Sequence, residues 1–319
     1  MSAMDPEVAV RVTELVKEFP DPGGGVLRAV DGVSFDVHRG EVFGFLGPNG
    51  AGKTTTLEIV EGLRRPTSGS TTVLGLDSQK HSNEMKDRIG VQLQSGAYFA
   101  FLTLEEILQL FGSFYPKALA PQELLDMVGL LDKRKALVGE LSGGQQQRFS
   151  IVASLVNDPE VVFLDEPTTG LDPQARRNLW DLIAHIHDDL GKTVIMTTHY
   201  MEEAQVLCGR VAIIDAGRIG AIDTPLGLIH ELPTAYRIMF ATTTTVDESA
   251  LAALPGVASV GRPTLGEFDY ELHIKRAQVT LPAFLEWAGS SGVAVDDVQV
   301  LPATLEDVFL SLTGRSLRE

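Results

Sequence analysis

Residues 47–55 of the chain read Gly47-Pro48-Asn49-Gly50-Ala51-Gly52-Lys53-Thr54-Thr55, which fits the pattern G-x-x-x-x-G-K-T. An apolar strand is expected just before this stretch at Val42–Leu46, and a helix just after it over Thr56–Glu61. Glycines at these positions let successive backbone N–H groups and the helix N-terminus surround a polyphosphate. Lys53 would then contact the β- and γ-phosphates, and the Thr54 hydroxyl would bind Mg²⁺. The stretch therefore predicts a nucleoside triphosphate site between a strand and a helix.

The composition limits the class of protein and its surroundings. The 319 residues carry a formal net charge of −17, which disfavours nonspecific binding to nucleic acid or anionic lipid. Cys208 is the only cysteine, so no disulfide forms within the chain, and this suits a reducing cytoplasm. We expect neither a secretory signal nor a membrane-spanning segment, because the apolar runs have the length of strands. Action at a membrane would therefore require another chain.

The order of apolar patterns predicts an α/β fold. Val33, Phe35 and Val37 alternate with polar residues, as in an antiparallel strand with one face exposed. The strands expected at Val161–Leu164 and Thr193–Met196 are apolar on both faces, which is typical of a parallel sheet covered by helices. Helices are expected over 145–155 and 174–190, and Thr103 with Glu106 predicts a capping box. This order predicts a parallel-sheet core, an antiparallel β subdomain and a helical subdomain at about residues 95–157.

The composition changes near Pro233, and we place a boundary there between residues 1–232 and 233–319. The second part reads β-α-β-β-α-β, which predicts a small α+β domain of ferredoxin-like type. Its strands are expected at 236–241, 258–260, 270–274 and 295–301, and its helices at 248–254, 281–288 and 304–312. The residues of this part form no catalytic constellation, so we expect a dimer-stabilising or regulatory module, or inert packing.

Two further motifs carry chemistry. The strand Val161–Leu164 ends in Asp165 and Glu166, where both carboxylates can face the crevice at the edge of the sheet. Asp165 would hold Mg²⁺, and Glu166 would be the base that polarises the attacking water. The run Ser142-Gly143-Gly144-Gln145 precedes a helix and predicts a second anion site, made of a hydroxyl and free backbone N–H groups. It contains no lysine, so it would complete the site that Lys53 occupies.

The order of these motifs resembles that of the ATP-binding subunits of ABC transporters. Gly47–Thr55 matches the Walker A loop of that family, Leu141–Gln145 its signature sequence and Val161–Glu166 its Walker B strand. The resemblance covers Val8 to Pro225. It implies an ATPase with ATP and Mg²⁺ as cofactors, on a P-loop fold of the ABC type.

The resemblance also assigns roles to residues that mean little by themselves. Gln94 matches the Q-loop glutamine, which senses Mg²⁺ and water and couples to the membrane partner. His199 matches the switch histidine that contacts the γ-phosphate, and Asp172 lies in the D-loop. Phe19 falls where the family stacks an aromatic ring on adenine.

The family joins two ATP-binding subunits head to tail, with the signature of one over the phosphate loop of the other. One copy of each motif therefore implies a homodimer with two composite sites, in which Ser142 and Gly144 act on the γ-phosphate in trans.

The runs Met201-Glu202-Glu203-Ala204 and Leu305–Leu310 resemble the daunorubicin-resistance group of ABC-2-type multidrug exporters. This implies an exporter of drug, lipid or polysaccharide with separate permease chains, and a position on the cytoplasmic face of the membrane. The alternative is a soluble ABC ATPase that acts in translation or DNA maintenance. The acidic charge and the absence of a heptad run disfavour that alternative. A third possibility is a regulatory protein that binds the nucleotide without hydrolysing it, and the presence of Glu166 disfavours it.

Overall fold

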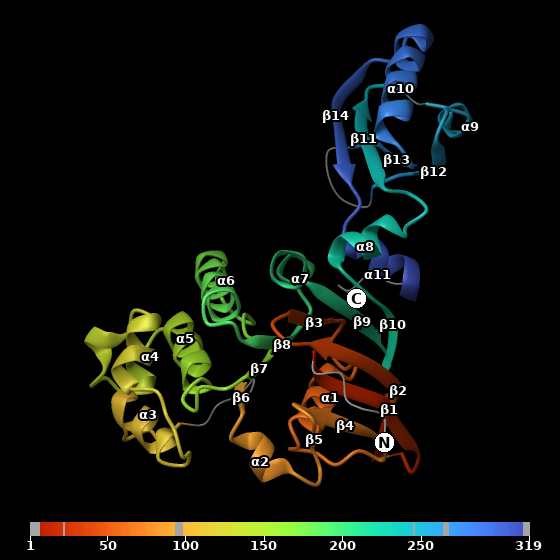
Figure 1. Cartoon of the computed structure of the whole chain (residues 1–319). Coiled ribbons are helices and arrows are strands. Elements are labelled where there is room, and N and C mark those ends of the chain that lie inside the picture. The colour runs from red at the N-terminus through yellow and green to blue at the C-terminus, as the bar shows by residue number, and fades with distance from the viewer. Residues whose placement is uncertain (1–6, 22, 93–97, 245, 264–267, 315–319) are drawn as a thin grey trace. The chain divides into compact units, whose positions relative to one another are not determined.

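The structure is a computed structural model that describes residues 7–21, 23–92, 98–244, 246–263 and 268–314. It divides into two compact units, Met1–Thr224 and Pro225–Glu319. Figure 1 shows their helices and strands. The division falls at the start of α8 (Pro225–His230), close to the change in composition near Pro233.

The core of the first unit is a six-stranded sheet in the order β10-β9-β3-β8-β7-β6. All neighbouring strands are parallel except β10, which runs antiparallel to β9. Every residue of β3, β7 and β8 is buried, as expected for strands covered on both faces. The strand predictions at Val42–Leu46 and Val161–Leu164 are confirmed. The bounds are β3 (Val42–Leu46), β6 (Ile89–Gln92), β7 (Val161–Asp165), β8 (Thr193–Thr198), β9 (Arg210–Asp215) and β10 (Arg218–Asp223).

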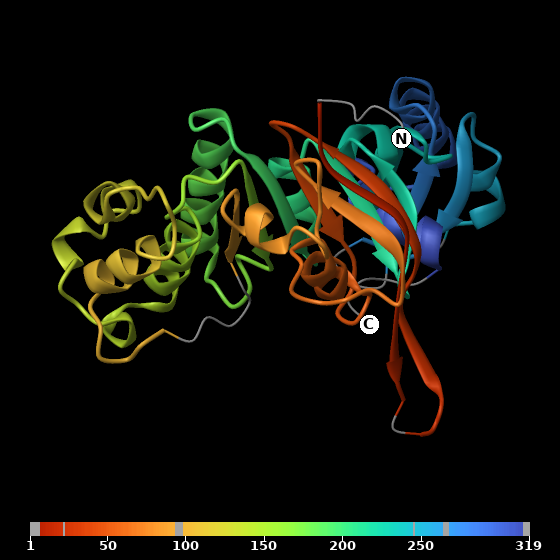
Figure 2. The ribbon, with the colours of Figure 1, turned by 60° about the horizontal axis from the view of Figure 1, so that its bottom comes forward.

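A four-stranded antiparallel sheet, in the order β2-β1-β4-β5, packs on this core. Val33, Phe35 and Val37 are buried, as their alternation predicted. Phe35 lies 5.6 Å from Phe43 and 5.0 Å from Phe45 between ring centroids, so aromatic packing joins the two sheets. Figure 2 shows the paired ends of β1 and β2 (red) projecting beyond the rest of this sheet as a two-stranded ribbon. The bounds are β1 (Val8–Pro20), β2 (Val26–His38), β4 (Ser68–Val73) and β5 (Leu76–Asp77).

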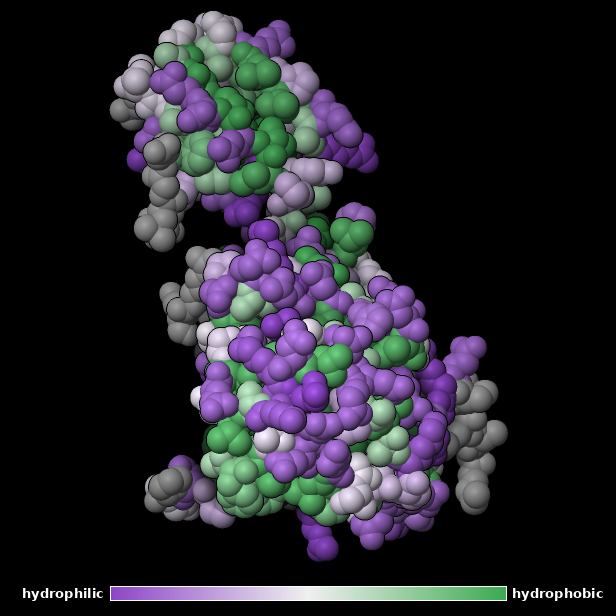
Figure 3. Space-filling model, turned by 90° about the vertical axis from the view of Figure 1, so that its left-hand side faces the viewer, coloured by the Kyte–Doolittle hydropathy of each residue, from purple (hydrophilic) through white to green (hydrophobic). Residues whose placement is uncertain are grey.

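The helices of the first unit include the helical subdomain that the sequence predicted. The predicted capping box is present at the start of α3, where the Thr103 N–H donates to Glu106 Oε2 at 2.8 Å and the Thr103 hydroxyl accepts from the Glu106 N–H. Figure 3 views this unit from the side of α3 and α4, where hydrophilic side chains predominate. No helix in the described ranges is both long and apolar enough to cross a membrane. The bounds are α1 (Lys53–Val60), α2 (Ser82–Lys86), α3 (Leu104–Gly112), α4 (Pro121–Met127), α5 (Gly143–Ala153), α6 (Pro173–Asp188) and α7 (Met201–Leu207), with 3₁₀ turns at Leu131–Lys133 and Val138–Glu140.

The second unit contains an antiparallel sheet in the order β12-β13-β11-β14. Its core is built around Phe240 and Phe284, whose ring centroids lie 4.7 Å apart. The elements after α8 follow each other as β-α-β-β-α-β and then a last helix, while the ferredoxin-like assignment stays a prediction. The bounds are β11 (Tyr236–Thr242), α9 (Glu248–Ala252), β12 (Val257–Gly261), β13 (Tyr270–Ile274), α10 (Ala277–Ser291), β14 (Val295–Pro302) and α11 (Leu305–Thr313).

Candidate active site

Two positions of the loop between β3 and α1, Gly47 and Gly52, accept only glycine. A Cβ on Gly47 would lie 2.1 Å from the carbonyl oxygen of Ile214, and one on Gly52 would lie 2.3 Å from that of Ala29. Gly52 also has a φ of +99°, which side chains disfavour. Gly52 is the N-cap of α1 and no side chain caps this helix, so the first backbone N–H groups of α1 remain available to an anion.

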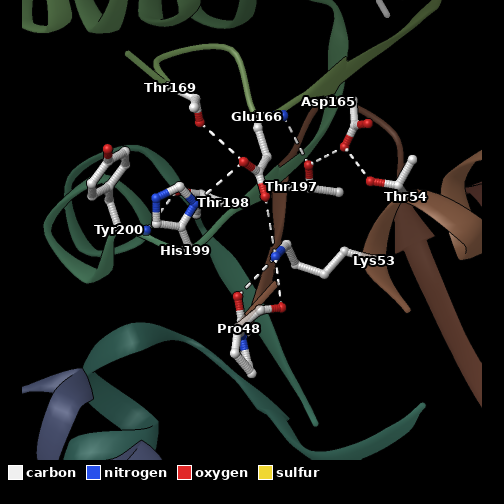
Figure 4. A network of polar contacts seen from close by, with 11 residues as sticks. Pro48, Lys53, Thr54, Asp165, Glu166, Thr169, Thr197, Thr198, His199 and Tyr200 are labelled. Carbon is white, nitrogen blue, oxygen red and sulfur yellow. Dashed lines mark hydrogen bonds and ion pairs between the residues drawn. The ribbon is translucent and has the colours of Figure 1, made fainter. Parts of the chain in front are cut away.

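Lys53 is the first residue of α1 and its ammonium group is buried in the loop. The Nζ atom donates to the carbonyl oxygens of Gly47 at 2.8 Å and Pro48 at 3.1 Å, and it lies 3.2 Å from Glu166 Oε1. Figure 4 shows this group at the centre of the polar network. Burial lowers the pKa of Lys53, and the nearby Glu166 and Asp165 carboxylates offset only part of that shift. Lys53 is thus a cation held in place by groups that a polyphosphate could replace.

Asp165 is the last residue of β7 and is held by two hydroxyl groups. Its Oδ1 atom accepts from Thr54 Oγ1 at 3.1 Å and from Thr197 Oγ1 at 2.5 Å. Burial raises the pKa of Asp165, while these hydroxyls act in the opposite direction. The predicted Mg²⁺ ligands Thr54 and Asp165 are therefore adjacent (Figure 4).

Glu166 follows Asp165 and connects three parts of the site. Its carboxylate contacts Lys53, accepts from Thr169 Oγ1 at 3.0 Å, and lies 3.3 Å from His199 Nδ1. Burial by itself would raise the pKa of Glu166, but Lys53, Thr169 and His199 together hold it below its ordinary value. Its φ of +46° is strained for a residue with a side chain, which is a common property of functional sites.

A pocket of about 420 Å³, called the Lys53 pocket below, surrounds the loop between β3 and α1. The predicted adenine-stacking residue Phe19 is part of its wall. Phe19 pairs with Leu27 across β1 and β2, and both side chains line the pocket. Lys17 and Arg64 lie over the Phe19 ring, 5.1 Å and 5.2 Å from its centroid. The remaining lining residues are Ala29, Asn49, Gly50, Gly52, Lys53, Thr54, Thr55 and Glu166.

The predicted second anion site lies elsewhere on the chain. Ser142 is the exposed N-cap of α5, and it forms a capping box with Gln145, whose Oε1 atom accepts from the Ser142 N–H at 3.1 Å. Asp172 is likewise the exposed N-cap of α6 and accepts from the Ala175 N–H at 2.8 Å. Neither residue lines the described part of the Lys53 pocket. Gln94 lies outside the described residues.

Two threonines that the sequence analysis did not select hold the carboxylates in place. Thr197 donates to Asp165 and also accepts from the Glu166 backbone N–H at 2.9 Å, and Thr169 donates to Glu166. Their positions gave the only available signal, because Thr197 comes two residues before His199 and Thr169 three residues after Glu166.

Comparison with known proteins identifies the family. Residues 30–169 match the family model described as ABC transporter. The linearmycin resistance ATP-binding protein LnrL of Bacillus subtilis (strain 168) is 36% identical over 302 residues, covering 92% of this chain and 96% of the relative. The daunorubicin resistance ATP-binding protein DrrA2 of Streptomyces coeruleorubidus is 37% identical over 316 residues, covering 96% and 95%. A Nod factor export ATP-binding protein I, from Ralstonia nicotianae, is 38% identical over 301 residues, covering 92% of each chain.

Solved structures agree with this assignment. A dimeric ATP-binding cassette in a post-hydrolysis state, bound to ADP and Pi, has a TM-score of 0.61 at 26% identity, covering 67% of this chain and 98% of that one. CbiO1 from Clostridium perfringens, part of an ABC transporter complex, has a TM-score of 0.60 at 28% identity, covering 70% and 92%.

The chain therefore belongs to the ABC transporter family as an ATP-binding protein. It is an ATPase of the exporter type, and the comparisons do not support the soluble alternative. The predicted α/β fold of the ABC type is confirmed.

Replacing Lys53 tests its role as the phosphate-binding cation. Lys53→Ala removes the ammonium group, so the Kd for ATP should rise by about tenfold to a hundredfold, the loss expected for charge-assisted hydrogen bonds. Isothermal titration calorimetry measures this directly. Lys80→Ala is the matched control, because the Lys80 side chain is 77% exposed and pairs with Asp77 outside the pocket. An unchanged Kd for Lys53→Ala would contradict the assignment.

Proposed function

We propose that this chain hydrolyses ATP with Mg²⁺ at the Lys53 pocket and thereby energises export through separate membrane chains. The observation that carries the proposal is the meeting of Lys53, Asp165, Glu166 and His199 at the carboxyl ends of β3, β7 and β8. In open α/β sheets this edge is where ligands bind. Gly47 and Gly52 let the loop pack closely against the carbonyl oxygens of Ile214 and Ala29, where a Cβ would clash.

The oxygen donors Thr54 and Asp165 fit Mg²⁺, which prefers hydroxyl and carboxylate ligands and takes the rest from phosphate and water. Gln94 is proposed to join them. When bound, the ion neutralises charge on the phosphates. Thr197 keeps Asp165 turned toward Thr54.

Glu166 is the proposed base. In the free chain it forms an ion pair with Lys53, and this pair opens when Lys53 turns to the β- and γ-phosphates. The Glu166 carboxylate, which still contacts Thr169 and His199, is then free to orient a water for in-line attack. His199 and Lys53 stabilise the charge that develops on the γ-phosphate.

A second copy of the chain is the proposed partner at the nucleotide. The run Ser142–Gln145 forms the exposed N-terminus of α5, and Asp172 is the exposed N-cap of α6. Neither lines the described Lys53 pocket of its own chain. In a head-to-tail dimer Ser142 and Gly144 reach the γ-phosphate of the other copy. The similar cassette of known structure is itself dimeric.

A permease is the second proposed partner, and it holds the chain at the inner face of the membrane. A pocket of about 430 Å³ lies between the parallel sheet and the helical subdomain, with Leu63, Tyr98, Phe111, Phe114 and Tyr115 in its wall. Leu63 and Phe114 are 53% and 69% exposed, so they offer apolar area to a cytoplasmic segment of the permease. The pocket is also lined by Gln92, which precedes the proposed coupling residue Gln94. Residues 233–319 are proposed as an accessory module of this assembly.

Glu166→Gln tests the base. The amide keeps the size of the side chain but is a far weaker base, so kcat should fall by about two to four orders of magnitude, the usual contribution of general-base catalysis. ATP binding should survive, and the ATP-bound dimer should become long-lived. Single-turnover hydrolysis and equilibrium binding separate the two effects, and near-normal turnover would reject Glu166 as the base.

Phe114→Asp tests the permease surface. The full chain is affinity-tagged in its native host and purified after solubilisation with a mild detergent. A polytopic membrane protein should co-purify with it and should alter the ATPase rate of the chain. A charge in the apolar pocket should reduce this recovery by about tenfold or more while ATP binding is retained. Phe101→Asp is the control, since Phe101 is 77% exposed and lies outside the lining of that pocket. Equal recovery by both variants would contradict the proposed surface.

A further inference from the structure

Glu61 is a buried carboxylate that the proposed reaction does not use. It is the C-cap of α1 and is only 3% exposed. Gly62 follows it with a φ of +73°, and a Cβ on Gly62 would lie 2.7 Å from the carbonyl oxygen of Ser78. Close packing therefore fixes the backbone beside Glu61. The side chain lines the pocket of about 430 Å³ between the parallel sheet and the helical subdomain, called the Glu61 pocket below.

The Glu61 carboxylate has no partner in the part of the chain that the structure describes. No group there donates a hydrogen bond to it, and no cation there lies within ion-pair distance. Lys86 also lines the pocket, but it is exposed and forms no ion pair with Glu61. A buried carboxylate is costly unless it receives hydrogen bonds or a cation. Glu61 is thus an acceptor that the described chain leaves unused.

The charges around Glu61 favour a cation. Burial raises the pKa of Glu61 to about 8, and the nearby carboxylates of Asp165 and Glu58 act in the same direction. Glu58 has a cation of its own, because Arg64 Nε lies 2.6 Å from its Oε2 atom. An ammonium or guanidinium group that reached Glu61 would favour the ionised carboxylate and form a charge-assisted hydrogen bond with it.

The walls of the Glu61 pocket limit what can carry that cation. They include the side chains of Leu63, Phe111, Phe114 and Tyr115. Leu63 and Phe114 are 53% and 69% exposed, so apolar area is open to a partner beside the carboxylate. An inorganic cation would gain nothing from these walls, whereas Arg and Lys carry their charge on an apolar stem and bind well to aromatic rings. The pocket therefore matches a protein segment with an apolar face and one basic side chain.

We propose that the permease segment at this pocket inserts one Arg or Lys side chain, whose cationic group pairs with Glu61. The inference rests on the proposed permease surface and names the chemistry by which that surface recognises its partner. Glu61 lies at one end of α1, and Lys53 and Thr54 lie at the other, about 12 Å away for a helix of this length. The basic side chain would thus contact the helix that also carries the phosphate-binding residues.

The first test replaces the carboxylate by its neutral isostere. In Glu61→Gln, recovery of the membrane protein that co-purifies with the tagged chain should fall by about tenfold or more, because the partner's charge is left buried and unpaired. Glu84→Gln is the matched control and should keep full recovery, since Glu84 is an exposed acid on α2 outside the pocket lining. The Tm of Glu61→Gln should stay the same or rise, because the change removes no ion pair of the resting chain.

A double-mutant cycle then identifies the partner's cation. Each Arg and Lys in the cytoplasmic segments of the recovered membrane protein is replaced by Gln and combined with the original chain and with Glu61→Gln. At one position the replacement should lower recovery by about tenfold with the original chain, but by less than about twofold with Glu61→Gln. The inference would be overturned if no basic position showed this coupling, or if Glu61→Gln kept full recovery. A lower Tm of Glu61→Gln would also overturn it, because it would mean that Glu61 already has a partner within its own chain.

Phe114→Asp, assayed in parallel, separates this inference from the proposed function. If Phe114→Asp lowers recovery and Glu61→Gln does not, the permease surface stands and only the pairing with a cation fails. If the original chain recovers no membrane protein, the proposed permease partner fails and this inference fails with it.

Discussion

The ion pair between Lys53 and Glu166 is the contact on which the site depends. Both side chains are buried, 4% and 7% exposed, and an ammonium group taken out of water costs several kcal/mol unless it is paired. The chain satisfies Lys53 with Glu166 and the carbonyl oxygens of Gly47 and Pro48. Phosphate oxygens can replace all three of these acceptors. The resting structure therefore already holds the Lys53 ammonium group where a bound triphosphate would lie.

The pair is possible because of the order of strands in the parallel sheet. β8 lies between β3 and β7, with Leu46 beside Thr198 and Asp165 beside Thr197. The loops that follow the three strands therefore converge at one edge. At this edge Glu166 has a strained φ of +46°, and Gly47 and Gly52 admit no side chain. Because Glu166 is paired with Lys53 in the resting structure, its surroundings change when Lys53 binds a phosphate instead.

Local signals explain why so much of this could be predicted from the sequence. The strand at Val42–Leu46, the strand ending at Asp165 and the capping box at Thr103 each depend on neighbours along the chain. Thr197 could not be found that way, because its partner Asp165 comes from another strand. Ser142 was predicted to lie just before a helix and is the N-cap of α5, but its predicted action on a γ-phosphate depends on a second copy that one chain does not contain.

The most direct test of the account is a crystal structure of the full chain with Mg²⁺ and a non-hydrolysable ATP analogue. The account predicts a two-fold dimer in which Lys53 has left Glu166 for the β- and γ-phosphates, and Ser142 of each copy contacts the γ-phosphate bound by the other. A nucleotide-saturated single copy in which Lys53 still holds Glu166 would contradict it.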